Sequence, residues 1–569
     1  MKRDGKKVNK TRDLLALEKS LEPCSSKGSV RVCLVYPNTY QAGMSSLGFQ
    51  TLFKLTNEQN DITCERAFYS IKTESGKSFE NNINLSKFDI IAFSISFEND
   101  YSNLVSLLQD AGIPLRSSRR NKFHPLVVAG GISCFLNPEP IASFIDCFLL
   151  GEAETFLKQF FDIYRDSTTK EETLERLATN LSCAYIPKFY EFDKNSQNNI
   201  KKAQPIIEHT RSTNKISYIT NLEKISTTTS ILTPGTSFKN IFLIETGKGC
   251  PHGCRFCSAG FIYRPPRFYS KKSIFASLKK GKQFTDKIGF VSAAVSDHPA
   301  INEICQEACI QGLRPSFSSF RADVLSKNTL SALGRTSIKT ATIAPEAGSQ
   351  KMRDRINKNI SEEEILNCTE YLVNSGIINL KLYFLIGLPF EEQNDIDEIV
   401  NLIKKIKQVF LTASKKQKKI GTITISVNPF IPKPSTPFQW IGFTNEKILK
   451  KRVKTIKDSI KRIANVTLKV ESIKQAKINA FLSRADRNAA DVIEDAIKVG
   501  WTKALKNHKD YADPIIYDDW DTDIDLPWDI VSTGLKKKFL KKELHKAEQF
   551  KTTLPCPMID CKKCKICKQ

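Results

Sequence analysis

Three cysteines on one short segment are the chain's clearest candidate for chemistry. They form the run Cys250-Pro-His-Gly-Cys254-Arg-Phe-Cys257. Thiolates are the usual ligands of iron–sulfur clusters, and three of them can bind three corners of a cubane cluster, which leaves one iron open. Zinc is less consistent with this spacing, because structural zinc usually has four ligands, and His252 has poor reach between two cysteines. The run therefore predicts an iron–sulfur cluster with an open iron.

A second set of cysteines lies near the C-terminus. Cys556, Cys561, Cys564 and Cys567 have the spacing C-x4-C-x2-C-x2-C. The consecutive C-x2-C steps are similar to those of ferredoxins and favour a further iron–sulfur cluster. Four thiolates also suit a closed zinc site, so zinc is the alternative.

The first run resembles the hallmark of the radical S-adenosylmethionine (radical SAM) enzymes, C-x3-C-x-aromatic-C, with Phe256 at the aromatic position. The resemblance implies a [4Fe–4S] cluster on Cys250, Cys254 and Cys257 whose open iron chelates SAM, with Phe256 beside the cofactor. It also implies that a reductant such as flavodoxin or ferredoxin supplies the electron that cleaves SAM to a 5′-deoxyadenosyl radical. The cofactor then carries the difficult chemistry, and the protein positions it.

Other stretches of the chain are similar to this family. Ser319-Phe-Arg321-Ala-Asp323 and Ala344-Pro-Glu346-Ala-Gly-Ser349 place polar groups where strands are expected to end. The resemblance implies that Arg321 and Glu346 are catalytic or SAM-binding groups and that Ser319 lies at the cofactor. The Gly-Gly-Glu motif that often follows the second strand is absent. Ser292 stands in its place, so its hydroxyl and nearby backbone carbonyls are expected to bind SAM instead.

Apolar runs alternate with helical patterns in the N-terminal part of the chain. Strands are predicted at residues 30–36, 88–94, 125–131 and 145–152, with helices at 46–55 and 101–111. This alternation predicts a doubly wound parallel sheet. Ligands of such sheets bind at the carboxyl ends of the strands. The candidate cofactor-binding residues there are Ser94, Gly130, Gly131 and Gly151.

This N-terminal region resembles the cobalamin-binding-like domain that precedes some radical SAM domains. The matching stretches include Ser94–Glu98, Gly130-Gly131 and Gly151–Glu154. The D-x-H-x-x-G motif, whose histidine ligates cobalt, is absent. Cobalamin held by that histidine is therefore excluded, and two possibilities stay open. Either cobalamin binds without a histidine ligand, or the domain binds substrate or only packs.

The alternation resumes in the middle of the chain. Six strands are predicted at residues 241–244, 288–294, 314–317, 339–343, 380–386 and 422–427, with helices at 361–375 and 395–411. They match the partial (β/α)6 barrel of radical SAM enzymes. The predicted organisation of this α/β protein is an arm (1–28), a cobalamin-binding-like domain (29–165), a linker (166–238), a radical SAM barrel (239–445), an α+β module (446–530) and a basic tail with the cysteine cluster (531–569).

Charge and hydropathy restrict the partners. The formal net charge is +25, and lysines concentrate in residues 447–461 and 536–568. This excess favours a polyanion such as RNA, although a lysine-rich proteome explains it equally well. No apolar run is long enough to span a membrane, and the thiols suit a reducing cytoplasm. The oligomeric state is not indicated.

These features predict a radical SAM enzyme whose leading substrate class is RNA, modified by methylation or sulfur insertion. One alternative is a radical SAM enzyme of small-molecule or cofactor biosynthesis. Another is a non-catalytic iron–sulfur protein that binds nucleic acid, against which the motif at Cys250–Cys257 argues.

Overall fold

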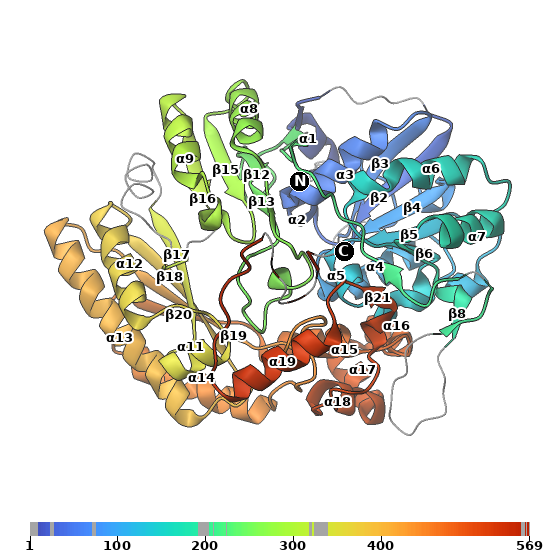
Figure 1. Ribbon diagram of the computed structural model, residues 1–569. Helices are drawn as coiled ribbons and strands as arrows, with labels where there is room; N and C mark the ends of the chain where they lie inside the picture. The colour runs from blue at the N-terminus through green and yellow to red at the C-terminus, as the bar shows by residue number, and fades with distance from the viewer. Residues whose placement is uncertain are drawn as a thin grey trace, which may run out of the picture.

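The computed structural model describes residues 10–22, 28–70, 75–191, 204–208, 210–223, 225–317, 321–323, 339–558, 561, 564, 566 and 567. Its N-terminal part is built on a six-stranded sheet in the order β3-β2-β4-β5-β6-β7, in which only β7 is antiparallel (Figure 1). The strands are β2 (Val30–Tyr36), β3 (Ile62–Phe68), β4 (Ile90–Ser94), β5 (Leu126–Gly130), β6 (Cys147–Leu149) and β7 (Ala184–Tyr185). The strands are largely buried by the packed helices, and β4, β5 and β6 accordingly appear in the sequence as apolar runs, whereas β3 also contains Glu65 and Arg66.

Six helices pack around this sheet, and their apolar residues complete one core. They are α2 (Tyr40–Ser45), α3 (Leu47–Asn57), α4 (Tyr101–Asp110), α5 (Ile132–Leu136), α6 (Leu157–Arg165) and α7 (Lys170–Asn180). The domain includes α7 and β7, so its sheet extends past the predicted boundary at residue 165. Two of its strands differ from the prediction. β6 is shorter than the predicted strand at 145–152, and no strand was predicted where β3 lies.

The middle of the chain contains two further sheets whose strands are all parallel (Figure 1). The first has the order β12-β15-β16 and the second β17-β18-β19-β20. Their strands are β12 (Phe242–Glu245), β15 (Lys287–Val291), β16 (Arg314–Phe317), β17 (Thr340–Glu346), β18 (Asn379–Ile386), β19 (Ile423–Pro429) and β20 (Val466–Val470). Within the described residues β16 and β17 are not paired. The topology thus establishes a mixed α/β protein, and the single partial barrel stays a prediction.

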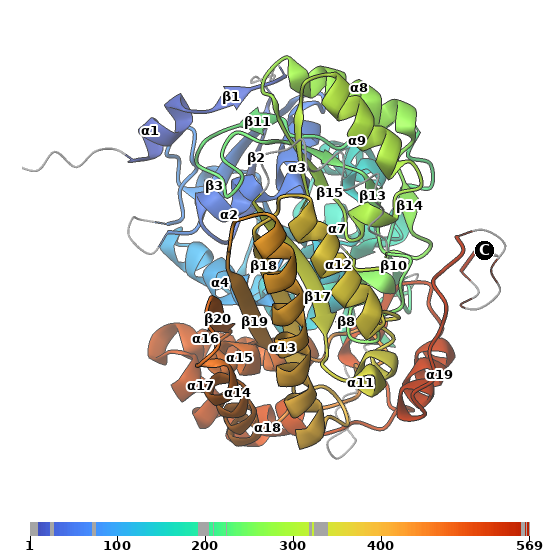
Figure 2. The same ribbon diagram turned by 90° about the vertical axis from the view of Figure 1, so that its left-hand side faces the viewer.

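Helices follow these strands as the periodicity predicts. Figure 2 shows α12 and α13 lying across one face of the second sheet. The hydroxyl of Ser361 caps α12 by accepting from the Glu364 N–H, and the Glu364 carboxylate accepts from the Ser361 N–H. The helices are α8 (Lys271–Lys282), α9 (Ile301–Ile310), α11 (Gln350–Arg355), α12 (Glu362–Asn374), α13 (Gln393–Lys416) and α14 (Glu446–Ile460).

The segment after residue 445 does not begin a separate module, because its first strand belongs to the second central sheet. Strand β20 pairs in parallel with β19, and α14 packs on α13, so the β/α alternation continues through residue 470. This differs from the predicted module boundary at 445, because a strand at the edge of the sheet was assigned to the next domain. The following helices are α15 (Ile473–Arg484), α16 (Ala489–Val499), α17 (Trp501–Asn507), α18 (Lys509–Tyr517) and α19 (Lys537–Glu548).

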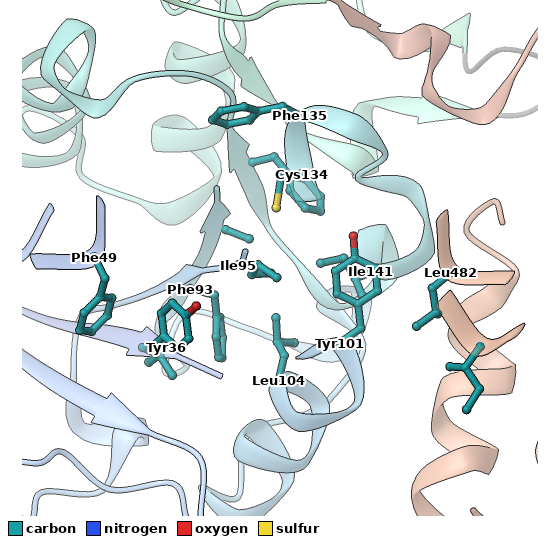
Figure 3. Close-up of a cluster of buried hydrophobic side chains, with 14 of the residues drawn as sticks. Tyr36, Phe49, Phe93, Ile95, Tyr101, Leu104, Cys134, Phe135, Ile141 and Leu482 are labelled. Carbon is teal, nitrogen blue, oxygen red and sulfur yellow. The ribbon is translucent and has the colours of Figure 1, made fainter. Parts of the chain in front are cut away.

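Helices α15 and α16 pack against the N-terminal domain. Figure 3 shows Leu482 of α15 beside Tyr101 and Ile141, within the same buried core. The Asn137 side-chain amide donates to the carbonyls of Ser483 and Ala485 at 3.1 and 2.8 Å. These contacts cover the carboxyl ends of the N-terminal strands with a helix from the far end of the chain.

Short strands tie the predicted linker to distant segments. β10 (Asn214–Lys215) pairs in parallel with β21 (Val531–Ser532), and β11 (Ile231–Leu232) pairs with β1 (Lys19–Ser20), which follows α1 (Lys10–Ala16). β8 (Tyr190–Glu191) and β9 (Gln204–Pro205) form a further antiparallel pair. No helix in the described part of the chain is long and apolar enough to cross a membrane.

Candidate active site and cysteine centres

The first cysteine loop follows β12 directly. Its start is a short pairing of β13 (Gly247–Lys248) with β14 (Arg267–Phe268). Gly249 has φ of +82°, and a Cβ there would lie 2.7 Å from Cβ of Tyr263, so only glycine fits this turn. The turn sets the direction in which the three cysteines leave the strand.

The three thiols of this loop lie close enough to affect one another's ionisation. Burial and the neighbouring Cys254 raise the pKa of Cys250 to about 12 and that of Cys257 to about 11. Thiolates crowded in this way need positive charge beside them. A cluster of iron supplies that charge and takes thiolate ligands, so the donor set fits the [4Fe–4S] group.

Two side chains hold the loop from below. The Arg255 side chain is fully buried, and its Nη1 donates to the carbonyl of Arg355 at 2.7 Å. The Asn357 side-chain amide donates to the carbonyl of Gly253 at 3.0 Å. Arg355 is the last residue of α11 and Asn357 follows that helix, so the loop is anchored on the segment that comes after β17.

Glu346 and Arg321, predicted from the family resemblance, lie in one polar network. Glu346 ends β17 at a shift in strand register and has φ of +66°, a conformation that costs free energy outside glycine. Its carboxylate accepts from Nζ of Lys358 at 3.1 Å. Arg321 forms two hydrogen bonds of 3.0 Å with Asp323 and donates a third to the Lys358 carbonyl.

Lys358 is a site residue that sequence reasoning missed. It is 7% exposed. Burial lowers its pKa, but the charges of Glu346 and Cys254 outweigh burial, so the pKa is raised overall and the amine stays protonated. The signal in the sequence is weak, because Lys358 lies in an ordinary Asn-Lys-Asn turn far from the cysteines.

A histidine–aspartate pair joins the loop to the end of β15. Nε2 of His252 lies 2.6 Å from Oδ1 of Asp297, and both side chains are largely buried. Three buried polar atoms in this region have no hydrogen-bond partner within the described residues: Nδ1 of His252, Oδ2 of Asp297 and Oγ1 of Thr246. Buried polar atoms are almost always paired in proteins, so we expect bound water or a ligand to pair with these atoms.

The remaining predicted cofactor residues of this half have local roles. Ser292 Oγ accepts from the Ala294 N–H at 3.4 Å and so shapes the turn after β15. Phe256 is half-buried and packs on a small core that contains Phe261 and Trp528. Ser319 lies outside the described residues.

The glycines predicted to line a cofactor at the N-terminal sheet contact the chain itself. Ser94 and Gly130 are ladder partners in β4 and β5. A Cβ on Gly131 would lie 2.3 Å from the Ile95 carbonyl oxygen, and one on Gly151 would lie 2.2 Å from that of Ser217. These glycines therefore allow close backbone packing within the domain, and the D-x-H-x-x-G histidine that would ligate cobalt is absent from the sequence.

Glu152, which follows β6, connects the N-terminal sheet to the segment beside the cysteine loop. Its carboxylate accepts from Nη2 of Arg267 at 2.9 Å and from the Ile219 N–H at 2.7 Å. The end of β6 is thereby fixed to the β13–β14 pair beside the cysteine loop.

The C-terminal cysteines also lie near one another. Cys556, Cys561 and Cys564 are buried and Cys567 is half-buried. Burial and then the other three thiols raise the pKa of Cys567, so the four converge, which fits a metal centre. In the described part of the chain, no three His, Cys, Asp or Glu side chains are arranged to hold one metal ion. A cubane cluster spreads its thiolates over separate irons, so that finding concerns single-ion sites.

The two predicted basic segments differ in their surroundings. On α19, Lys546 lies 2.8 Å from Glu543, Lys537 lies 3.5 Å from Asp529, and Lys541 pairs with Asp523. On α14 and its C-cap, by contrast, six lysines are exposed and none has an ion pair within the described residues: Lys447, Lys450, Lys451, Lys454, Lys457 and, at the C-cap, Lys461.

Comparisons with known proteins match both halves of the chain. The family model "Radical SAM proteins, N-terminal" matches residues 48–187, and "Radical SAM superfamily" matches residues 244–403. The uncharacterized protein MJ0966 of Methanocaldococcus jannaschii is 31% identical over 465 residues, which cover 81% of this chain and 90% of that protein.

Two solved structures are also similar. The radical SAM methyltransferase TsrM from Kitasatospora setae, with tryptophan substrate and a SAM analog bound, has a TM-score of 0.50 at 9% identity, covering 84% of this chain and 99% of that chain. The cobalamin-dependent radical SAM enzyme OxsB, with aqua-cobalamin and SAM bound, has a TM-score of 0.45 at 13% identity, covering 70% of this chain. This chain spans only 56% of the OxsB chain.

Proposed function

Because the chain belongs to the radical SAM superfamily, with that family's N-terminal domain, and is a radical SAM enzyme, we propose that it modifies RNA, by methylation or by sulfur insertion. The stripe of six exposed lysines on α14 and its C-cap carries the proposal. These positions fall on adjacent turns of one helix, where they are available to phosphates. Together with the net charge of +25, they favour a polyanionic substrate.

The family implies a [4Fe–4S] cluster and SAM, and the residues near the cysteine loop fit that chemistry. When bound, the reduced cluster supplies the electron that cleaves SAM to methionine and a 5′-deoxyadenosyl radical. Asp297 is held by His252 through Oδ1 and keeps Oδ2 available to accept from an ammonium group. Lys358 holds the Glu346 carboxylate in place, and the burial of both keeps water away from the reacting groups.

We propose further that the two central sheets form one partial barrel around this site. The cysteine loop leaves the first strand of one sheet, and Glu346 ends the first strand of the other. The Asn357–Gly253 hydrogen bond joins them. Active residues of such folds lie at the carboxyl ends of the strands, which is where both lie.

The C-terminal cysteines are proposed to hold a second iron–sulfur cluster, with zinc as the alternative, and flavodoxin or ferredoxin is the proposed class of reductant. Cobalamin is not part of the proposal, because the D-x-H-x-x-G histidine is absent and Gly131 and Gly151 pack against the chain's own backbone.

The test begins with anaerobically reconstituted protein, SAM and dithionite, with and without total RNA from the source cell. We expect 5′-deoxyadenosine, and a mass change in the RNA that identifies a methyl group or a sulfur atom. 5′-Deoxyadenosine without RNA affinity at low salt would support a small-molecule substrate instead. No 5′-deoxyadenosine under any condition would support the non-catalytic alternative.

The role of α14 has its own measurement. RNA affinity should fall as salt rises, with a slope of log affinity against log salt of about −0.7 per contacted phosphate of a single strand. Replacing Lys450, Lys454, Lys457 and Lys461 with Glu should flatten that slope and leave SAM cleavage intact. The matched control reverses Lys415, Lys416, Lys418 and Lys419, exposed at the end of α13, and should change neither slope nor cleavage.

A further inference from the structure

The two cysteine sets are far apart in the sequence but contact each other directly. The backbone N–H of Cys556 donates to the carbonyl of Pro251, which follows Cys250, at 2.8 Å. In Figure 1 the segment after α19 runs up to the loop that follows β13. One cysteine of the C-terminal set is therefore bonded to the loop that carries the first set.

A buried arginine forms the centre of this contact. Arg255, inside the first cysteine run, donates through Nη2 to Oε2 of Glu543 at 3.1 Å and to the Lys551 carbonyl at 2.7 Å. Both side chains are almost fully buried, at 0% and 3% exposure. An uncompensated charge is costly inside a protein, so the cysteine loop requires α19 and residue 551 in this position.

A second bridge lies beside the first. Asn357 uses its side-chain amide to bind the Gly253 carbonyl, and its side-chain oxygen accepts from the Thr553 N–H at 2.6 Å. Asn359 donates to the Thr553 carbonyl at 3.0 Å. The segment from 551 to 556 thus lies along the loop and is bonded to it or to its support at residues 551, 553 and 556.

We infer that metal binding at Cys556–Cys567 and at Cys250–Cys257 are coupled through these contacts, each centre stabilising the other. The inference rests on the proposed C-terminal metal centre. Metal ligation by several cysteines close together in the sequence fixes the path of the segment that carries them. A fixed Cys556 holds 551–556 on the loop, and Arg255 and Glu543 act as positioning residues between the centres. Such coupling is reciprocal, and its usual size is about 5- to 150-fold in affinity.

The test uses the full chain, reconstituted anaerobically with iron and sulfide and then exposed to an iron(II) chelator. Retention at the first centre is followed by the electron paramagnetic resonance signal of the reduced cluster and its change on adding SAM. In the Cys561→Ser/Cys564→Ser variant we expect the iron affinity of the first centre, measured from the iron retained at equilibrium with the chelator, to fall about tenfold or more. In the Cys250→Ala/Cys254→Ala/Cys257→Ala variant, metal at the C-terminal centre, iron or zinc, should be bound more weakly too.

The Glu543→Gln variant distinguishes coupling between the two centres from the ability of each centre to take up metal. Both centres should still take up metal, and each should bind it as weakly as when the other is absent. Glu548→Gln, on the same helix but half-exposed, is the matched control and should behave as wild type. Arg255→Lys repeats the test from the other side, and circular dichroism checks that each variant is folded.

The outcomes distinguish the two proposals. Wild-type protein without metal at Cys556–Cys567 would overturn both the C-terminal centre and the coupling. Metal at both centres, with retention unchanged in every variant, would overturn the coupling alone.

Discussion

Nε2 of His252, inside the first cysteine run, lies 2.6 Å from Oδ1 of Asp297, at the turn after β15. The pair joins the cysteine loop to the next strand of the same sheet. Oδ2 of Asp297 and Nδ1 of His252 stay buried without partners in the described part of the chain. The family's Gly-Gly-Glu motif is absent after β15. The carboxylate of Asp297 lies a few residues beyond the place where that motif would stand.

Asp297→Asn is expected to weaken SAM cleavage while leaving the iron content of the first centre unchanged. A hydrogen bond to a charged group contributes about 1.5–3 kcal/mol, which corresponds to a loss of roughly 10- to 100-fold. The measurement is the rate of 5′-deoxyadenosine formation at limiting SAM. Asp286→Asn, which removes a surface ion pair with Arg314 next to β15, is the control and should retain wild-type rates.

Replacing Cys250, Cys254 and Cys257 with Ala should abolish SAM cleavage, because no ligands remain for the first cluster. The C-terminal centre should still take up iron or zinc, though it should hold the metal more weakly. Metal analysis and 5′-deoxyadenosine assay check both statements. Cys309→Ala, a half-buried thiol on α9, serves as the control. Unchanged cleavage in the triple variant would place the open-iron cluster elsewhere.

Asp100 should make stability depend on pH. It is 2% exposed; burial raises its pKa to about 6, although the hydrogen bond from Asn38 lowers it. The folded chain then binds this proton more tightly than the unfolded chain, where the pKa is about 3.9. Ionisation of Asp100 therefore destabilises the fold. This destabilisation is absent at low pH, where the carboxyl is protonated in both states, and it is complete above the folded pKa.

The free energy of unfolding of Asp100→Asn, minus that of wild type, should rise by about 1 kcal/mol from about pH 5 to about pH 8. Urea unfolding at the two pH values measures the difference. Asp110→Asn, exposed at the end of α4, should show no such gain. A gain in the opposite direction would mean that Asp100 is ionised and compensated in the fold.

Purified protein mixed with hydroxocobalamin and passed through a desalting column should carry no stoichiometric corrin absorbance. The reason is that the chain has no D-x-H-x-x-G histidine to ligate cobalt, and that Gly131 and Gly151 pack against the chain's own backbone. A bound corrin would contradict this. If it also showed nitrogen hyperfine splitting from a protein imidazole, the inference from the missing D-x-H-x-x-G motif would be wrong as well.

Elements with uniform patterns were predictable from the sequence, and those that depend on distant partners were not. The apolar runs of β2 and β5 and the capped helix α12 lie close to their predicted positions. Strand β3 was missed because it contains Glu65 and Arg66, whose charges suggest a surface. In the fold Arg66 is buried by ion pairs with Glu18 and Glu80 that no local pattern reveals.

The site shows the same division. Family recognition and the radical SAM assignment followed from the spacing of Cys250, Cys254 and Cys257, and the comparisons confirm them. The Lys358–Glu346 pair and the His252–Asp297 pair depend on which strand ends meet in space, which spacing along the chain does not encode. The predicted role of the glycines at the N-terminal sheet assumed an open edge, whereas α15 arrives there from more than three hundred positions later.

The pairing of β10 with β21 has a consequence for biosynthesis. Residues 214–217 bond to Gly151 on one side and to residues 531–532 on the other, so the N-terminal half stays incomplete until the last part of the chain leaves the ribosome. Residues 543–556 emerge later still, and they cover the cysteine loop. During translation the loop therefore lacks these contacts until residues 543–556 have been synthesised.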